Sequence, residues 1–366
     1  MKKLKKIIMW FIIILAAFVA GIIIFMQQDK FGALPSGERL ERIKKSPNYR
    51  DGEFRNLSPT PALAENTSYY TVIKDFFFNK SKRSTPKEPL PHIKEDLLHL
   101  DPDEDVIVWF GHSSYFMQVD GKTFLADPVF SGHASPVKFT TKAFEGTDAY
   151  TTDDLPEIDY LFISHDHWDH LDYETMLKLK PKVKKIITGL GTPAHLELWG
   201  FDVSMIEERD WNEAIDIGNG FTVYTAPARH FSGRGLKRNK ALWMSFVLAA
   251  PTMKIYLGGD SGYGSHFKDI GNQHGPFDLA ILECGQYNEH WKYIHMMPDE
   301  VVQAADDLKA KRLMPVHWSK FSLSLHSWDE PIQKIHTAAA AKIPLLAPII
   351  GEKVTIKPVE ATGTLK

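Results

Sequence analysis

The stretch FISHDHWDH, from Phe162 to His170, places three histidines and two aspartates directly after an apolar run. Imidazole nitrogens and carboxylate oxygens are side-chain ligands that zinc takes in proteins. Because one residue separates His165 from His167, both side chains can face the same way from an extended turn. Asp169 and His170 then reach a second position from the start of the following helix. A polar, solvent-exposed loop is the alternative, and so dense a cluster disfavours it. The stretch therefore predicts a metal site where a strand ends.

Short apolar runs rich in Val, Ile, Phe and Tyr predict buried strands from residue 106 onward. They lie at residues 106–110, 123–127, 160–164, 185–189, 221–226, 242–250, 254–260, 279–283 and 313–317. Helical stretches at 173–180 and 298–311 intervene. Strands that alternate with helices favour an α/β domain whose sheets are covered on both faces.

Four of these runs end in, or lead into, histidine or aspartate side chains. Ligands of α/β proteins collect outside the carboxyl ends of strands, so we expect these side chains to meet at one edge. Seven such residues are enough for two metal sites. They are His165, His167, Asp169, His170, His230, Asp260 and His317.

Composition narrows the classes of function. The 366-residue chain is 43% hydrophobic and 24% charged, which is typical of a globular protein with one large domain or two small ones. Its net charge of −3 gives no basic field that would attract nucleic acid. Cys284 is the single cysteine, which excludes a disulfide framework and a cysteine-rich zinc site. Histidine and carboxylate side chains must therefore hold any metal, and Cys284 is predicted to be a small core residue.

The N-terminus predicts a membrane anchor over residues 1–26. Four lysines in MKKLKK precede twenty uncharged residues, Ile7–Met26. A helix of that length spans about 30 Å, the thickness of a bilayer core. A cleaved signal peptide is the alternative, but its apolar region is shorter and ends in a small-residue cleavage site, for which QQDKFGALP is poor. The positive-inside rule keeps the lysines cytoplasmic, so we expect a single-pass anchor with the catalytic domain outside the cytoplasm.

Residues 27–105 are rich in proline, glycine and charge and show little periodicity. This composition predicts a linker and an extension that wraps over the main domain. The segment also contains three adjacent phenylalanines, Phe76–Phe78. We expect them to pack onto the domain, with contact to a membrane or a lipid as the alternative.

The polar segments at the strand ends resemble those of the metallo-β-lactamase superfamily. They are HDHWDH, PARHFSGR with His230, GGDSGYG with Asp260, and PVHW with His317. Asp127 in FLADPVF matches the first motif of that superfamily.

Longer stretches resemble the N-acyl-phosphatidylethanolamine phospholipase D branch of the superfamily and its bacterial relatives. They are WFGHSSYFMQVDGKTFLADPVF, HFSGRGLKRNKALWMSF, HMMPDEVV and HWSKFSLSLHSWDEP. The resemblance runs from about residue 106 to about residue 350, roughly two thirds of the chain. Ile294 is a departure, because the mammalian member of the branch has a polar amide residue there. The predicted N-terminal anchor is a second departure from the mammalian member.

The resemblance implies an αββα sandwich, with two β-sheets face to face and helices outside. We place it over residues 106–358, after the transmembrane helix that the N-terminal sequence predicts at 7–26. It also implies two zinc ions per chain, or another divalent metal in their place. One metal would take His165, His167 and His230, the other Asp169, His170 and His317, and Asp260 would bridge both.

Several residues fall close to the implied ligands without belonging to them. We expect Asp127 to hold the ligand loop, and Asp166 to turn toward its own loop or to orient a histidine ligand. His112 and His326 lie in matched segments and either line the pocket or are structural histidines. His295, in YIHMMPDE, matches an active-site histidine of the family.

We expect His295 and Asp260 to be catalytic, with His295 steadying the phosphate or the leaving oxygen. The alternative for His295 is that it precedes and caps a helix that begins near Pro298.

The predicted function is a membrane-anchored dinuclear zinc phosphodiesterase that hydrolyses a phospholipid as phospholipase D does. N-acyl-phosphatidylethanolamine would give N-acylethanolamine and phosphatidic acid. The expected partners are the phospholipid and the membrane, and no nucleic acid is expected. The sequence leaves open whether the chain forms a homodimer. A metal-dependent lactonase or other ester hydrolase is the alternative, since the same metal pair can attack a carbonyl. A purely structural zinc role is disfavoured, because structural sites are closed and usually mononuclear.

Overall fold

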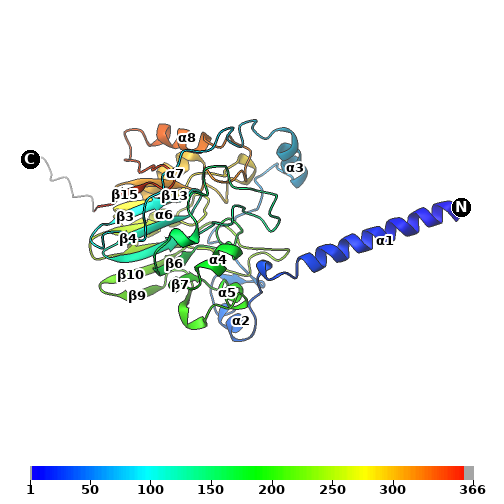
Figure 1. Cartoon of the computed structure of the whole chain (residues 1–366), viewed down its shortest axis with the longest axis horizontal. Helices are drawn as coiled ribbons and strands as arrows, with labels where there is room; N and C mark the ends of the chain where they lie inside the picture. The colour runs from blue at the N-terminus through cyan, green and yellow to red at the C-terminus, as the bar shows by residue number, and fades with distance from the viewer. Residues whose placement is uncertain (1, 358–366) are drawn as a thin grey trace, which may run out of the picture.

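The computed structural model describes residues 2–357 of the chain. Met1 and residues 358–366 lie outside the described residues, and with them the predicted domain end at Pro358. Two β-sheets stand face to face with helices on their outer sides (Figure 1). This arrangement confirms the predicted αββα sandwich.

The first sheet has seven strands in the order β15-β3-β4-β5-β6-β7-β8, and the second has six in the order β14-β13-β12-β11-β10-β9. The bounds of the first are β3 (Val106–Trp109), β4 (Tyr115–Val119), β5 (Lys122–Ala126), β6 (Ile158–Ile163), β7 (Val183–Gly189), β8 (Ile206–Arg209) and β15 (Lys353–Thr355). Those of the second are β9 (Ala214–Gly218), β10 (Phe221–Ala226), β11 (Ser245–Ala249), β12 (Lys254–Leu257), β13 (Leu279–Glu283) and β14 (Leu313–Val316).

Aromatic side chains from both sheets fill the space between them. Phe124 and Phe162, from neighbouring strands of the first sheet, stack with their ring centroids 6.0 Å apart. The Phe162 ring also lies 4.9 Å from the ring of Phe246, which comes from the second sheet. All three are almost completely buried, so this layer supplies much of the apolar area removed from water on folding.

Helices cover the outer face of each sheet. Met176, Leu179 and Leu196 anchor α4 (Tyr173–Leu179) and α5 (Pro193–Leu198) in the apolar cluster on the outer side of the first sheet. Helices α6 (His266–Gln273), α7 (Pro298–Asp307) and α8 (Glu330–Ala339) cover the second sheet in the same way.

Two predicted elements are four residues longer than the observed ones. The apolar run at 242–250 becomes a strand only at Ser245, because Leu242 and Met244 donate their backbone N–H groups to Leu190 and Ser164 of the other sheet's loops. The helix predicted at 298–311 ends at Asp307, and Lys309 beyond it adopts a left-handed backbone with φ of 58°. In both cases contacts outside the element set its end.

An isolated helix, α1 (Lys2–Phe25), precedes the domain and projects away from it (Figure 1). None of its residues is buried. By length and composition it could cross a membrane, and an N-terminal signal sequence would pass the same test. The predicted apolar span of 7–26 lies almost wholly within this helix.

The segment after α1 runs along the domain and contains short elements only. They are η1 (Asp29–Phe31), α2 (Gly37–Ile43), β1 (Tyr49–Arg50), β2 (Glu53–Phe54) and α3 (Tyr69–Phe78). Arg39 on α2 holds the segment to the domain, since its guanidinium donates to Glu197 at 2.8 Å and to Glu208 at 3.2 Å.

The three phenylalanines of α3 do not behave alike. Phe76 stacks on Trp291 at a ring distance of 6.1 Å, as predicted for residues that pack onto the domain. Phe77 and Phe78 are each 79% exposed, so the prediction is wrong for these two. The helical turn explains the difference, because neighbouring residues on a helix point about 100° apart.

Candidate metal centre

The loops after four strands converge at one edge of the sandwich. Strand β6 of the first sheet leads into the segment 165–170, whereas β10, β12 and β14 of the second sheet lead to His230, Asp260 and His317. Because the two sheets face each other, side chains from both reach a common point. The seven residues predicted from the strand ends therefore lie together, as expected.

One group consists of His165, His167, His230 and Asp260. His167 Nδ1 lies 2.9 Å from His165 Nε2 and 3.3 Å from His230 Nε2. Asp260 Oδ2 lies 3.8 Å from His165 Nε2 and 3.7 Å from His230 Nε2. Ligand atoms bound tetrahedrally at the usual zinc–nitrogen distance are about 3.3 Å apart, so this spacing fits a single ion.

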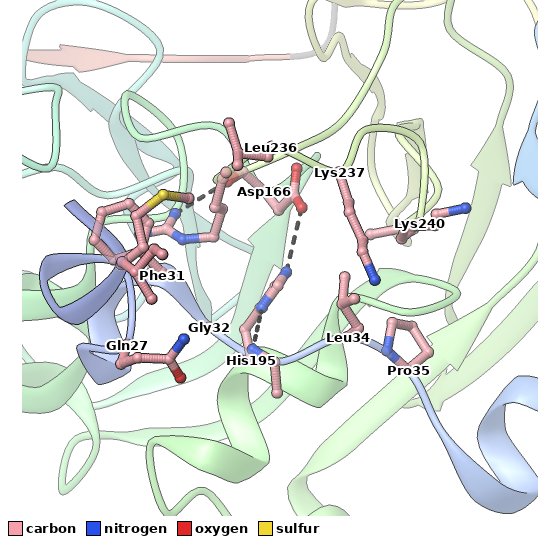
Figure 2. A pocket seen from close by; sticks show the side chains of 16 residues that line it. Gln27, Phe31, Gly32, Leu34, Pro35, Asp166, His195, Leu236, Lys237 and Lys240 are labelled. Carbon is pink, nitrogen blue, oxygen red and sulfur yellow. Dashed lines mark hydrogen bonds and ion pairs between the residues drawn. The ribbon is translucent and has the colours of Figure 1, made fainter. Parts of the chain in front are cut away.

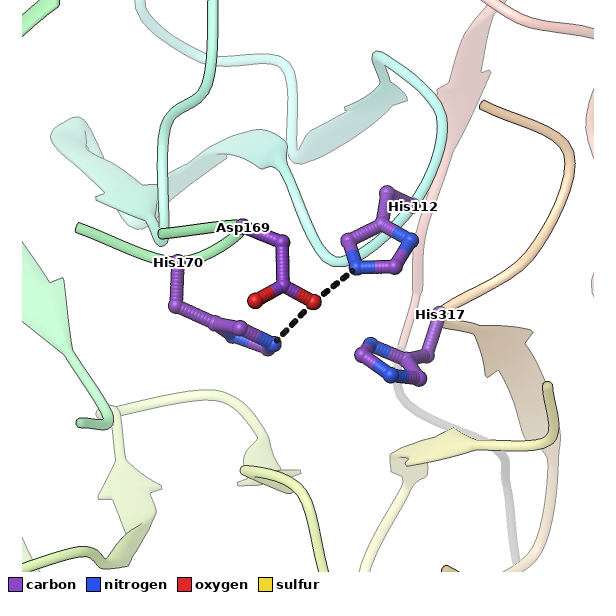
Figure 3. Close-up of side chains that lie close together, drawn as sticks. All are labelled: His112, Asp169, His170 and His317. Atoms are coloured by element: carbon purple, nitrogen blue, oxygen red, sulfur yellow. Dashed lines mark hydrogen bonds and ion pairs between the residues drawn. The ribbon is translucent and has the colours of Figure 1, made fainter. Parts of the chain in front are cut away.

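A second group consists of His112, Asp169, His170 and His317, shown in Figure 3. Asp169 Oδ2 lies 2.8 Å from His112 Nε2 and 3.6 Å from His170 Nε2. The sequence left two roles open for His112, in the pocket or in the structure. The fold places it directly beside Asp169. Its backbone is fixed to that of His317, which donates to the His112 carbonyl at 2.8 Å.

Asp260 lies between the two groups. Its Oδ2 is 3.2 Å from His170 Nε2, and its Oδ1 is 3.1 Å from His317 Nδ1. A carboxylate in this position can contact an ion in either group, and the bridging role implied by the resemblance stays a prediction. Asp260 also belongs to a third group that could hold a metal, together with Glu283, His295 and His317.

Buried polar atoms at the centre lack ordinary partners. His170 Nε2 and Asp260 Oδ1 make no hydrogen bond within the described residues, although each has an oppositely charged group nearby. Unpaired buried polar atoms cost free energy that a bound cation would recover. The residues present therefore fit a divalent metal ion.

Most protonation states suit metal binding; His170 is the exception, because Asp260, Asp169 and Asp127 outweigh burial and raise its pKa well above the ordinary value. Burial lowers the pKa of His165, His230 and His317 well below the ordinary value, so these imidazoles are neutral and can donate a lone pair. Burial alone would raise the pKa of Asp260, but the charged His170 beside it outweighs burial and holds that pKa well below its usual range. Neutral histidines and an ionised carboxylate are the forms that ligate a metal.

Left-handed backbone conformations gather at this edge. Asp127, His112 and His317 have φ values of 38°, 52° and 68°. Non-glycine residues rarely adopt this conformation, and where they do it clusters at functional sites.

Asp127 lies beneath the ligand loop. Its carboxylate accepts hydrogen bonds from Ser164 N at 2.8 Å and from Ser164 Oγ at 2.5 Å. It also lies 2.8 Å from Nδ1 of His170, the ring nitrogen that faces away from the centre. These contacts orient both the loop and the His170 ring.

Asp166 turns away from the centre into a separate network. It accepts from Gly233 N at 2.6 Å and lies 3.2 Å from His195 Nε2, while His195 Nδ1 accepts from Ala33 N at 3.1 Å (Figure 2). Nothing in the sequence pointed to His195, because it lies inside a helix without motif character. The ligand loop is thus tied to the segment that follows α1.

Arg234 also links the ligand loop to the segment that follows α1, and this role was not predicted from the sequence. Its guanidinium donates to the carbonyl of Asp166 at 3.0 Å and to that of Lys30 at 2.9 Å. It lies 4.0 Å from the ring centre of Trp168. A cavity of about 370 Å³ beside it is lined by the end of α1, residues 31–35 and the loop 234–241 (Figure 2).

His295 is buried next to the metal groups and pairs with Glu283. Its Nδ1 lies 3.0 Å from Glu283 Oε2, and its ring centre is 5.1 Å from that of His230. Burial raises the pKa of Glu283 to about 7, and Glu283 in turn raises the pKa of His295 against the opposing effect of burial. Glu283 ends an apolar strand, and this position at a strand end could have identified it from the sequence.

The alternative role of His295 as a helix cap is wrong. The residue that caps α7 is Met297, whose backbone N–H donates to Glu300 at 2.8 Å.

His326 has a structural role. Its Nε2 accepts from Gln286 N at 2.9 Å, and its Nδ1 lies 2.8 Å from the carbonyl of Ser327. Both ring nitrogens are therefore used by the backbone, which leaves none for a ligand. Cys284 is completely buried, as predicted, and its pKa is well above the ordinary value because of that burial.

A cavity of about 380 Å³ opens onto the metal groups. Polar side chains form one end of it, among them His167, Asp169, His230, Asp260, His295 and His317. Apolar and aromatic side chains form the walls, among them Ala62, Leu63, Tyr69, Val72, Phe76, Phe231, Trp291 and Leu323. A polar end with apolar walls suits a ligand that has a charged group and an apolar chain.

The sequence of this chain is similar to those of known proteins. The beta-lactamase superfamily domain matches residues 122–318. An uncharacterized protein of Mycobacterium bovis is 37% identical over 316 residues, which cover 85% of this chain and 85% of that protein. The N-acyl-phosphatidylethanolamine-hydrolyzing phospholipase D 1 of Caenorhabditis elegans is 31% identical over 245 residues, covering 62% of this chain and 67% of that protein.

Structural comparison agrees on the fold. The metallo hydrolase Igni18 of Ignicoccus hospitalis superimposes with a TM-score of 0.52 at 19% sequence identity, over 69% of this chain and 98% of that one.

Proposed function

This chain belongs to the beta-lactamase superfamily and is a metal-dependent hydrolase, and on that premise we propose that it hydrolyses the phosphodiester bond of a membrane phospholipid as phospholipase D does. The observation that supports this most is the cavity of about 380 Å³, which joins two histidine–aspartate groups to apolar and aromatic walls. The relatedness to N-acyl-phosphatidylethanolamine-hydrolyzing enzymes supports the choice of bond.

In the proposal, two zinc ions occupy the centre. His165, His167 and His230 would hold one, Asp169, His170 and His317 would hold the other, and Asp260 would contact both. When bound, such an ion pair supplies an acidic water and neutralises the charge of a phosphate group. The chain's own residues must then admit the lipid, orient its phosphate and handle the leaving oxygen.

His295 is suited to the leaving oxygen or to the phosphate itself. It lines the cavity, and Glu283 accepts the hydrogen of its Nδ1, which directs Nε2 toward the cavity as a donor when the ring is charged. Arg238 lines the same cavity and brings a second positive charge. Two cations beside the metal groups favour an anionic substrate.

The apolar walls suit the acyl part of a lipid. Tyr69, Val72 and Phe76 of α3 and Phe231 from the loop after β10 line the cavity. Burying a lipid chain against them is favourable in proportion to the apolar area covered. Helix α1, as a single-pass anchor, would keep this cavity close to lipid.

The experiment that tests the proposal is hydrolysis of N-acyl-phosphatidylethanolamine in oxygen-18 water, with mass analysis of each product. The label should enter phosphatidic acid, because attack at phosphorus leaves the water oxygen on the phosphate. The Asp260→Asn variant should lose most of the turnover. Label in a freed fatty acid, or in the released alcohol, would exclude the proposed mechanism. Lactone opening without lipid turnover would favour the lactonase instead.

A further inference from the structure

We propose that the exposed face of α3 is a second membrane contact, which holds the mouth of the metal cavity against the bilayer that α1 crosses. The face consists of Tyr70, Ile73, Phe77 and Phe78. The inference rests on the anchor that is part of the proposed function, but not on the identity of the reaction.

The four side chains form one apolar face of a short helix. They recur at intervals of three, four and one residue, which places them on one side of α3. Tyr70 is 77% exposed, Ile73 55%, and Phe77 and Phe78 79% each. Aromatic and branched side chains gathered in this way are costly in water but favourable at a membrane–water interface.

Contacts on the opposite side fix α3 in this orientation. Asp75 Oδ2 lies 2.7 Å from His290 Nε2, and Phe76 stacks on Trp291. The Ser68 hydroxyl caps the helix by accepting from Thr71 N at 3.1 Å. Turning the exposed aromatics toward the domain would break these contacts, so their exposure is built into the packing.

The same helix forms a wall of the metal cavity. Tyr69, Val72 and Phe76 line it, while Phe231 and Arg238 line it from the loop after β10. The apolar residues of α3 thus share one cavity with the metal groups, and Tyr69 among them is 64% exposed, so this wall reaches the molecular surface.

The loop after β10 connects this cavity to the end of α1. Leu236, which is 87% exposed and labelled in Figure 2, lines the cavity there. Ile23 of α1 and Met26 just after it line the same cavity. A Cβ atom on Gly235 would lie 3.5 Å from Met26. One short loop thus reaches from the anchor to the metal cavity, and α3 forms the wall beyond it.

The orientation of α1 points to lipid as the occupant of the α3 face. In Figure 1, α1 and α3 lie on the same side of the domain. A bilayer crossed by α1 would lie on that side, so an interfacial helix there meets lipid without any rearrangement. A second copy of the chain is the other occupant that an apolar face can have, and the experiment distinguishes the two.

The test uses the full chain in lipid nanodiscs, with a polarity-sensitive fluorophore on a Phe77→Cys variant. Cys284 is buried and should not react, so labelling is specific. We expect a blue shift relative to a detergent solution, and quenching by lipids that are spin-labelled near the head group. Pro251→Cys is the matched control, because Pro251 is exposed in the turn between β11 and β12, at the opposite edge from the metal groups. The control should show neither effect.

Two results would overturn the proposal. One is a probe at position 77 that stays as hydrated in the nanodisc as in detergent. The other is a blue shift in detergent that grows with protein concentration, which would identify a second copy of the chain as the partner.

A kinetic measurement gives an independent check. The double variant Phe77→Ser, Phe78→Ser should lose roughly tenfold of its turnover on bilayer lipid, because the cavity mouth is no longer held at the interface. Turnover of a water-soluble phosphodiester should be unchanged, since neither residue lines the cavity. Equal losses on both substrates would contradict the proposal. If the wild type cleaves neither substrate, the proposed reaction fails while the fluorescence result still decides the membrane contact.

Discussion

Two imidazole nitrogens, Nε2 of His165 and Nε2 of His230, lie 2.9 Å and 3.3 Å from a third, Nδ1 of His167. Neutral rings do not gather in this way for their own stability, because the lone pairs repel and burial removes water from each of them. A cation resolves both problems.

Replacement of His165 and His167 by alanine should remove at least one metal equivalent. Each group needs its histidines for tetrahedral binding, and two of them come from one short turn. Elemental analysis of protein purified without chelator should give near two equivalents for the wild type. His326→Ala is the control, since both of its ring nitrogens bond to the backbone, and it should keep its metal. Full metal content in the double variant would contradict the ligand assignment.

His295→Ala and Glu283→Gln should lower turnover while the metal content stays near that of the wild type. His295 acts on the phosphate or leaving oxygen in our proposal, and Glu283 positions it at 3.0 Å. Loss of a residue that orients such a group costs about 10–100-fold in activity. The turnover number and elemental analysis should be measured on the same preparation. Loss of metal from either variant would reassign His295 to the third metal-binding group.

At the scale of elements, the metal loop after β6 is not a free turn. Asp166, through His195, and Arg234 tie it to the backbone at Ala33 and Lys30, in the segment that follows α1. The N-terminal segment is therefore part of the packing that shapes the centre. Burial lowers the pKa of Arg234 to about 10, so the guanidinium stays charged at neutral pH and bonds strongly to the carbonyls around it.

Arg234→Ala should destabilise the fold markedly. The change leaves the buried carbonyls of Asp166 and Leu171 without their donor, at a cost of about 3 kcal/mol. For a chain of this size we expect the unfolding midpoint to fall by roughly 6 °C. Thermal unfolding followed by circular dichroism measures the shift. Arg55→Ala is the matched control, because Arg55 is half-exposed and forms surface ion pairs only. Equal unfolding midpoints for the two variants would show that the contacts of Arg234 do not stabilise the fold.

The whole molecule has one long apolar helix at one end and the metal centre within reach of its base. Helix α1 has no buried residue, and its lysines precede the apolar span. This layout is what an anchored enzyme with a lipid substrate requires. The exposed face of α3 on the same side adds a second point of contact in our proposal.

The anchor should have its N-terminus in the cytoplasm and the rest of the chain outside. The positive-inside rule retains the four lysines before Ile7 on the cytoplasmic side. A reporter that works only outside the cytoplasm, fused after Lys366, should be active, and salt should not extract the protein from membranes. Activity of a cytoplasm-specific reporter at the same position would disprove the orientation. Release of a shortened soluble chain would identify a cleaved signal peptide.

The sequence by itself determined the chemistry of the centre and the class of the fold. Seven histidines and aspartates stand at the ends of apolar runs, and this local order survives folding because strand ends of facing sheets share an edge. Motif resemblance supplied the αββα arrangement, which strand periodicity alone could not give.

Only the tertiary structure decided which residues surround that centre. Glu283 lies beside it, while His195 and Arg234 hold the loop that carries its ligands, and these contacts depend on how the sheets, helices and N-terminal segment pack. The tertiary structure also showed that Phe76 packs on the domain while Phe77 and Phe78 are exposed. The three residues are identical in the sequence but point in different directions from the helix. The physical reason is that ligand types are local properties of a chain, whereas burial and partnership arise from contacts between segments far apart along it.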